Sequence, residues 1–174
     1  MAYDIVTTMM DQILTIATLE MQTNIATTDP LRLKTVEKAP LQKDKTSKIV
    51  APFIVVAFDV AEGRILDPVH DYEMGGGVKW LNFLSVVGRI PRETTKDAAY
   101  VSIAKFGQRF LRAMLKHWDL DGVVADDGET VFDSTIDIIE RHRHRVIGGD
   151  NEWYGEFCTD LHFYSVETPE MRGL

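Results

Sequence analysis

The sequence predicts an α+β fold: a mixed or antiparallel sheet, an N-terminal helix and one long helix packed on one face, and a C-terminal β-hairpin. Three observations predict it. Apolar residues recur at helical spacing in residues 4–22 and 96–118. Continuous or alternating apolar runs mark strands at 52–60 and 78–90. A turn sequence at Gly148–Asn151 separates two further strand-like segments.

The N-terminal part is expected to be a helix followed by an extended arm. Met9, Ile13 and Ile16 form an apolar row within residues 4–22, whose remaining surface is mostly Thr, Gln, Asp and Glu. Asp29-Pro30 ends this region. Residues 29–48 are polar and lysine-rich, so we interpret them as a long loop or arm, a length that is uncommon unless the loop is functional.

Two strands come next. The run PFIVVAFDV at 52–60 is typical of a buried strand, and Ile65-Leu66 continues the pairing. Residues 70–77, which end in three glycines, are expected to be a loop. The segment 78–90 has apolar residues on both of its sides, so we expect a strand covered on both faces, in part by something outside the monomer.

The long helix is predicted from residue 96 to residue 118, with Thr94 or Thr95 as its N-cap. Its expected apolar face consists of Val101, Ala104, Phe110, Leu111, Met114, Leu115 and Trp118. Four basic residues at i, i+4, i+7 and i+11 form a stripe on the opposite face. This basic stripe is either a solvated helix face or a candidate subunit interface that docks on an acidic partner surface, and it consists of Lys105, Arg109, Arg112 and Lys116.

An acidic loop at 119–133 follows the helix. Its candidate interface residues are Asp119, Asp121, Asp126, Asp127 and Glu129. They do not have the spacing of a calcium loop, because Val123 stands where an oxygen ligand is needed. We therefore interpret the loop as solvated or as an acidic patch between subunits.

Residues 134–166 are expected to form the hairpin. Residues 134–146 fit a strand or a short helix, and their β-branched content favours a strand. On a strand, the arginines at 141, 143 and 145 share one face and the histidines at 142 and 144 the other. Arg141, Arg143 and Arg145 are candidates to pair with the acidic loop of the same or a neighbouring copy. The two histidines lack the further ligands of a tetrahedral metal site, so no metal is expected there.

Composition excludes several classes of protein. The chain has 174 residues, a formal net charge of −8 and a single cysteine, which indicates one domain over 1–174 and no intrachain disulfide. No apolar run approaches the roughly 20 residues of a membrane span, and the N-terminus has no signal-peptide pattern, so a cytosolic origin is expected. No catalytic motif is present, and we expect neither an enzyme nor a cofactor.

The charge is segregated along the chain. Residues 75–118 sum to +6 and residues 119–140 to −8, followed by +3 over 141–145. These blocks either fold back into intramolecular ion pairs or form complementary faces that meet in neighbouring copies of a ring. The negative total argues against nucleic acid as the main partner.

The order of elements resembles that of the tail terminator proteins of long-tailed bacteriophages. The matching segments are DIVTTMMDQILTIATLEM, APFIVVAFDV, VKWLNFLSVVGRI, AAYVSIAKFGQRFLRAMLKHW, STIDIIERHRHRV and EWYGEFCTDLHFYSVE. The resemblance is one of pattern and order over most of the chain. The arm 29–48 and the segment 61–77 are longer than in the compact family form, which leaves open another neck or head–tail connector protein.

The resemblance implies a structural virion protein, made in the host cytoplasm, that forms a homohexameric ring at the head-proximal end of a phage tail. Such a ring terminates polymerisation of the tail tube and joins the tail to the head connector. The implied partners are other copies of the chain, the tail tube protein and the head–tail connector or neck protein, with transient proximity to packaged DNA and no membrane. Two other classes stay open: a small nucleic-acid-binding regulatory module, which would use the basic strips, and a small-molecule enzyme of an unfamiliar family.

Overall fold

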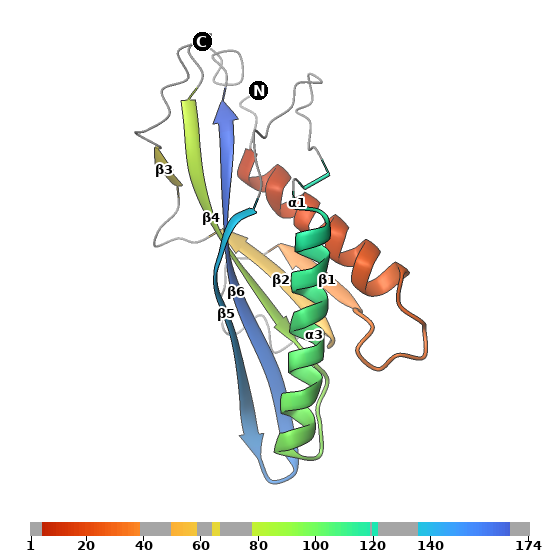
Figure 1. Ribbon diagram of the computed structural model, residues 1–174. Coiled ribbons are helices and arrows are strands. Elements are labelled where there is room, and N and C mark those ends of the chain that lie inside the picture. Colours follow the sequence, from red (N-terminus) through yellow and green to blue (C-terminus); the bar gives the residue numbers. More distant parts are fainter. Residues whose placement is uncertain are drawn as a thin grey trace.

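The computed structural model describes residues 5–38, 50–58, 64–66, 78–118, 120–121 and 136–167. They form a mixed sheet with two helices on one of its faces, so the predicted α+β class is confirmed (Figure 1). The central strand order is β1-β2-β4-β6-β5, and the short β3 (Arg64–Leu66) also pairs with β4. All strand pairs are antiparallel except β1 with β2.

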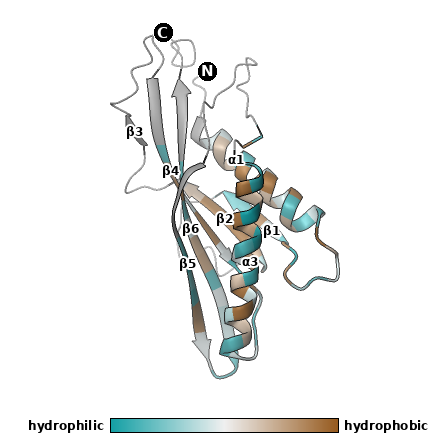
Figure 2. Ribbon diagram, in the orientation of Figure 1, coloured by the Kyte–Doolittle hydropathy of each residue, from teal (hydrophilic) through white to brown (hydrophobic). Residues whose placement is uncertain are grey.

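The predicted N-terminal helix is present as α1 (Ile5–Thr18), which continues as a short π-helix, η1 (Leu19–Thr23). Met9, Ile13 and Ile16 are buried, as the apolar row predicted. Figure 2 shows hydrophobic residues in both helices and in the coloured parts of the central strands. The helix therefore owes its stability to docking on the sheet, since isolated helices of this length are marginal in water.

Part of the predicted arm is instead a strand. Residues Thr35–Lys38 form β1, which pairs in parallel with the start of β2 (Phe53–Phe58). Leu33 is fully buried just before this strand, and Val36 packs against the core. A few apolar residues in a polar segment are enough to anchor an edge strand, because its neighbour supplies the hydrogen bonds. Residues 39–48 of the arm lie outside the described part of the chain.

Residues 82–88 of the strand β4 (Val78–Arg89) are buried on both faces within the single chain. Leu84 and Val86 contact the helices, and Phe83 and Val87 on the other face are also buried. These four residues are covered within the chain, while the side chains of residues 78–81 lie outside the described part, so the expectation that something outside the monomer covers part of this strand stays a prediction. The predicted loop at 70–77 lies outside the described residues.

The long helix is α3 (Lys96–Lys116), and its N-cap is Thr95, whose hydroxyl accepts a hydrogen bond from the amide of Ala98. The predicted apolar face is only partly correct. Phe110 and Met114 are buried, but Val101, Leu115 and Trp118 are more than half exposed. The core-facing row is instead centred on Ala99, Ile103, Phe106, Gly107 and Phe110.

The C-terminal hairpin is confirmed as β5 (Ile136–Gly149) and β6 (Glu152–Glu167), joined by Asp150 and Asn151. Both turn residues have positive φ, of 49° and 65°, which is the geometry of a two-residue type I′ turn. Such a turn matches the right-handed twist of the flanking strands. Two register irregularities occur near the start of β5, between Ile136 and Ile138 and between Ile139 and Arg141.

Candidate functional site

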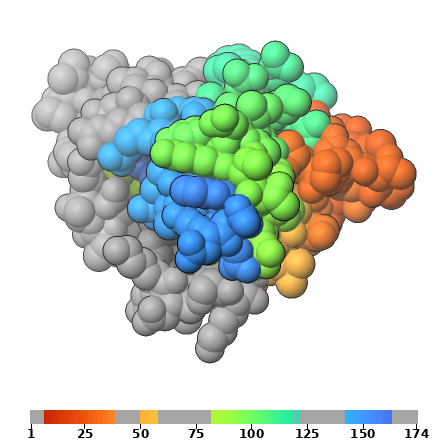
Figure 3. Space-filling view, turned by 90° about the horizontal axis from the view of Figure 1, so that it is seen from below, coloured from red at the N-terminus to blue at the C-terminus, as the bar shows by residue number. Residues whose placement is uncertain are grey.

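The hairpin and α3 lie against each other along much of their length (Figure 1). The Phe157 ring of β6 packs between Phe106 and Phe110 of α3, with centroid distances of 5.8 Å and 5.4 Å. Viewed from the turn of the hairpin, the surfaces of α3 and of the hairpin form one continuous face (Figure 3). The helix and the hairpin therefore present a composite surface to the outside.

Two apolar side chains of α3 and one just past its end are exposed, among polar residues such as Lys105 and Arg112. Val101 and Leu115 are 54% and 61% exposed, and Trp118 just past the helix is 51% exposed. Val101 and Leu115 lie about four helical turns apart and so project from the same side. We call Val101, Leu115 and Trp118 the apolar flank of α3. Exposed polar residues, Lys105, Gln108 and Arg112, lie between Val101 and Leu115 on this side of the helix, so the flank is a mixed surface with three large apolar side chains, and we take it as a candidate contact surface.

The strand β5 is an edge of the sheet. Among the described strands it pairs only with β6, while β1 lies at the opposite edge. One side of its backbone is therefore not paired with any strand in the described part of the chain. Edge strands with free N–H and C=O groups are templates for pairing with another chain.

The basic stripe of α3 is largely engaged inside the molecule. Arg109 donates a hydrogen bond to the Asp29 carboxylate at 2.7 Å, and Lys116 donates one to Glu20 at 2.6 Å. The hydrogen bond from Arg109 is the main reason that the pKa of Asp29 is lowered, with a smaller effect of Lys105. Arg112 forms no ion pair with any described residue. Two members of the stripe thus tie α3 to η1 and to the segment after it.

His117, at the C-terminal end of α3, strengthens the same contact. Its Nε2 lies 2.9 Å from Glu20 and its Nδ1 lies 2.6 Å from Asp121. These hydrogen bonds raise the pKa of His117, and those from Lys116 and His117 lower the pKa of Glu20 to about 2. Asp121 therefore serves an intramolecular contact. Asp119, Asp126, Asp127 and Glu129, the other acidic candidates, lie outside the described residues.

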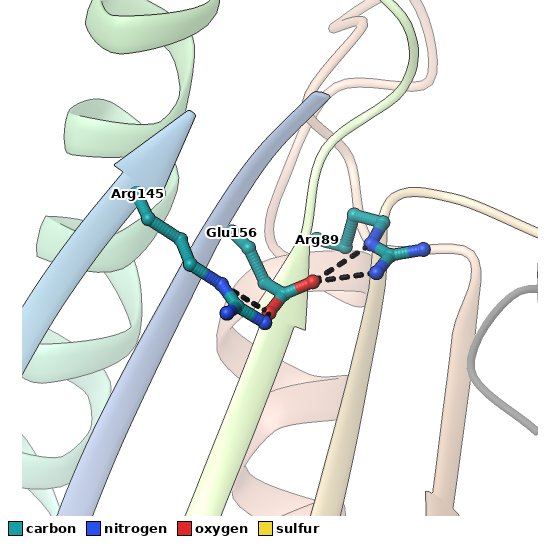
Figure 4. Close-up of polar contacts among 3 residues, drawn as sticks. All are labelled: Arg89, Arg145 and Glu156. Carbon is teal, nitrogen blue, oxygen red and sulfur yellow. Dashed lines mark hydrogen bonds and ion pairs between the residues drawn. The ribbon is translucent and has the colours of Figure 1, made fainter. Parts of the chain in front are cut away.

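Arg143 and Arg145 of β5 lie on the face of the hairpin away from α3, as the strand alternation predicts. Arg145 and Arg89 from β4 both bind the Glu156 carboxylate of β6 (Figure 4). Burial alone would raise the pKa of Glu156, but the hydrogen bonds from Arg89 and Arg145 outweigh it and lower the pKa. The Glu156 side chain is 8% exposed, so this is a charged cluster set into the sheet across three strands.

Arg143 has a weaker partner. Its guanidinium lies 3.7 Å from Asp160, and the Arg143 side chain is 65% exposed. Cys158 lies beside this pair, and burial together with Asp160 raises the pKa of its thiol, which disfavours a reactive thiolate. The side chain of Arg141 lies outside the described part of the structure. Arg143 and Arg145 thus pair with the neighbouring strand β6, and both keep exposed guanidinium groups.

The two histidines of β5 face α3. Their rings lie 4.5 Å apart at 90° to each other, and His142 also contacts Phe157. Among the described residues, no group of three or more His, Cys, Asp or Glu side chains is arranged to hold a metal ion.

Sequence reasoning did not find the partners in these contacts. Arg89 and Glu156 are 67 residues apart, and Lys116 and Glu20 are 96 apart. No regular spacing along the sequence relates residues that are this far apart. The only available signal was the alternation of charge blocks along the chain, which predicted ion pairs without assigning them.

The fold and this surface together define an α+β protein with an exposed apolar helix flank beside an edge strand. A scan of known protein families found no model that matches the chain, and a search of curated proteins found no similar sequence. None of the helices within the described ranges has the length and apolar character needed to cross a membrane.

Proposed function

We propose that the chain is a structural subunit that assembles head to tail with copies of itself into a ring. The observation that carries the proposal is the apolar flank of α3 beside the edge strand β5. Burying three large, half-exposed side chains on a neighbour would remove apolar surface from water, at about 25 cal/mol per Å². Paired strand edges would add hydrogen bonds and fix the register.

The topology is compatible with a head-to-tail contact. The two edges of the sheet are different: β5 has 14 residues and is flanked by α3, whereas β1 has four residues and lies beside α1. A contact between two different surfaces repeats from copy to copy and closes into a ring when its rotation permits. In an isologous dimer identical patches meet, so β5 would instead pair with β5 of the second copy.

Charge has a secondary role in this assembly. Arg109 and Lys116 are engaged within the chain, so they are poor candidates for contacts with a neighbour. Arg143 and Arg145 have largely exposed side chains on the edge strand β5, on the face of the hairpin away from α3. We assign them to the polar rim of the contact, where they meet acidic side chains of the next copy, a kind of interaction that affects specificity more than affinity.

For the ring we propose the role of a tail terminator at the head-proximal end of a phage tail. The support is the order of elements, since the N-terminal helix, the strand pair, the long helix and the C-terminal hairpin occur where that family has them. In this role the ring caps the tail tube and receives the head connector, inside the virion. The same ring could also occupy a different position in the neck. The partner that the ring binds distinguishes this position from the terminator position.

Light scattering coupled to size exclusion, with negative-stain microscopy of the same fractions, tests the assembly. We expect a ring for the natural chain and a monomer for Leu115→Lys and Val101→Lys. Thr15→Lys is the control, because it adds the same charge at an exposed position of α1. A natural chain that stays monomeric at every concentration and salt, also in the presence of tail tubes, overturns the proposal.

The terminator role has its own test. Purified ring is added to polymerising tail tube protein, and the tube lengths and ends are examined by microscopy. Capped tubes that stop growing support a terminator. Rings that do not bind tubes but bind the head connector support another position in the neck. Rings that bind neither partner overturn both proposed positions.

A further inference from the structure

The two edge strands of the described sheet, β1 and β5, run in opposite directions (Figure 1). β1 is parallel to β2, and each step from β2 to β4, from β4 to β6 and from β6 to β5 reverses the direction. When a second copy is rotated about an axis along the strands, its strands keep their direction. Its β1 therefore meets β5 of the first copy in antiparallel orientation, which is the slightly more stable kind of strand pair.

One row of cross-strand partners joins an acidic residue at one edge of the sheet to a basic residue at the other. Glu37 of β1 lies opposite Val55 of β2, and Val55 lies opposite Val87 of β4. Val87 lies opposite Cys158 of β6, which in turn lies opposite Arg143 of β5. A second copy that is placed beside the first along this row, without a shift along the strands, therefore brings its Glu37 opposite Arg143.

Glu37 and Arg143 lie on the same face of the sheet. Val36 packs against the core on the face that the helices cover, so the next residue, Glu37, lies on the other face, as Arg143 does. Both side chains are exposed. Within the described ranges Glu37 forms no ion pair, and Arg143 forms a long one, at 3.7 Å to Asp160. Both charged groups are therefore accessible to a partner of opposite charge on a neighbouring copy.

We propose that β5 of one copy pairs with β1 of the next copy, with Arg143 opposite Glu37, so that one sheet continues from copy to copy. The inference rests on the proposed ring and names the surface that β5 contacts in it. Opposite charges that face each other across an antiparallel pair stabilise it, and like charges destabilise it. Antiparallel pairing of β5 with β5 of a second copy would place Arg143 and Arg145 opposite arginines, so charge favours the junction of β5 with β1.

Cross-linking of the full-length chain tests this junction. Cys158→Ser is the parent variant, and Glu37→Cys and Arg143→Cys are added to it singly and together. A short bismaleimide links the two new thiols only between copies, because four strand spacings of about 4.8 Å separate the two positions within one chain. We expect a ladder of cross-linked dimers, trimers and larger species from the double variant on a reducing gel, and none from the single variants. Lys96→Cys in place of Arg143→Cys is the control, since Lys96 is exposed but begins α3.

A charge exchange gives a second measurement. Glu37→Arg and Arg143→Glu each place like charges at every junction, so each is expected to raise the protein concentration needed for assembly about fivefold. An equimolar mixture of the two variants is expected to restore assembly, because every junction between unlike copies then joins opposite charges. A mixture that assembles no better than its components overturns the pairing of Glu37 with Arg143.

Light scattering of the same samples separates this inference from the proposed ring, and circular dichroism checks the fold of each variant. Oligomers of the double cysteine variant that give no ladder overturn the junction of β5 with β1 but not the ring. Cross-linked dimers of either single variant show that identical edges meet, which also overturns the junction. A parent variant and a natural chain that both stay monomeric overturn the ring and the junction together.

Discussion

Arg89 donates hydrogen bonds from both Nε and Nη2 to one oxygen of Glu156, at 3.0 Å and 2.6 Å. The other carboxylate oxygen binds Arg145, so one buried acid connects β4, β6 and β5 (Figure 4). A buried carboxylate that is this well paired is costly to disturb, because its removal leaves desolvated charge without a partner.

Glu156→Gln is expected to destabilise the chain by about 2 kcal/mol, since the amide cannot neutralise two guanidinium groups. The matched control is Glu152→Gln, which removes an exposed ion pair with Arg92 and is expected to change stability by less than about 1 kcal/mol. Urea unfolding followed by circular dichroism measures both. Similar effects of the two substitutions would show that the cluster has no special role.

Gly107→Ala is expected to be destabilising by about 1–3 kcal/mol, although alanine is the better helix former. The new methyl group would meet both imidazoles of β5 at less than 3 Å. Gly149→Ala is the control, because a Cβ there meets no atom within 4 Å. Thermal unfolding compares them, and a stabilised Gly107→Ala variant would contradict the close packing of α3 on β5.

Acid is expected to destabilise the chain through His142. Its pKa is about 4 in the folded state and 6.5 ordinarily, so between these values the unfolded chain binds more protons and stability falls as pH falls. His142→Gln is expected to flatten this part of the profile of unfolding free energy against pH. An unchanged slope between pH 6.5 and 4 in the variant would refute the assignment.

Protonation of His117 is expected to stabilise the folded chain, which is the opposite of the effect expected for protonation of His142. Its pKa is raised in the folded state by Glu20 and Asp121, so its contribution is complete below pH 6.5 and is lost as pH rises through the folded pKa. His117→Gln is therefore expected to destabilise the chain at pH 5.5 more than at pH 9, measured by urea unfolding at both values. An equal loss of unfolding free energy at pH 5.5 and pH 9 would mean that the packing of His117, rather than its charge, stabilises the chain.

The hairpin turn offers a test at one position. Asn151 has a φ of 65°, which glycine adopts freely and β-branched residues adopt only with strain. Asn151→Gly is expected to stabilise slightly or leave stability unchanged, and Asn151→Val to destabilise by about 1–2 kcal/mol. Thermal unfolding of the pair measures the difference, and equal melting temperatures would argue against the type I′ turn.

The sequence by itself determined the elements of this protein. Apolar spacing and the Asp150-Asn151 turn identified the two helices and the hairpin, because periods of 3.6 and 2 are local properties of a chain. Strand alternation also placed Arg143 and Arg145 opposite His142 and His144 on β5. These are consequences of backbone geometry that neighbours along the chain already define.

Only the tertiary structure decided which face of each element is buried and which residues pair. It turned Leu115 and Trp118 outward although the helical pattern placed them in the core, because the sheet covers a narrower part of α3 than the apolar residues span. It made Thr35–Lys38 a strand through the hydrogen bonds of β2. It also joined Arg89 to Glu156 and Lys116 to Glu20, since charge pairing depends on distances in space that spacing in sequence does not contain.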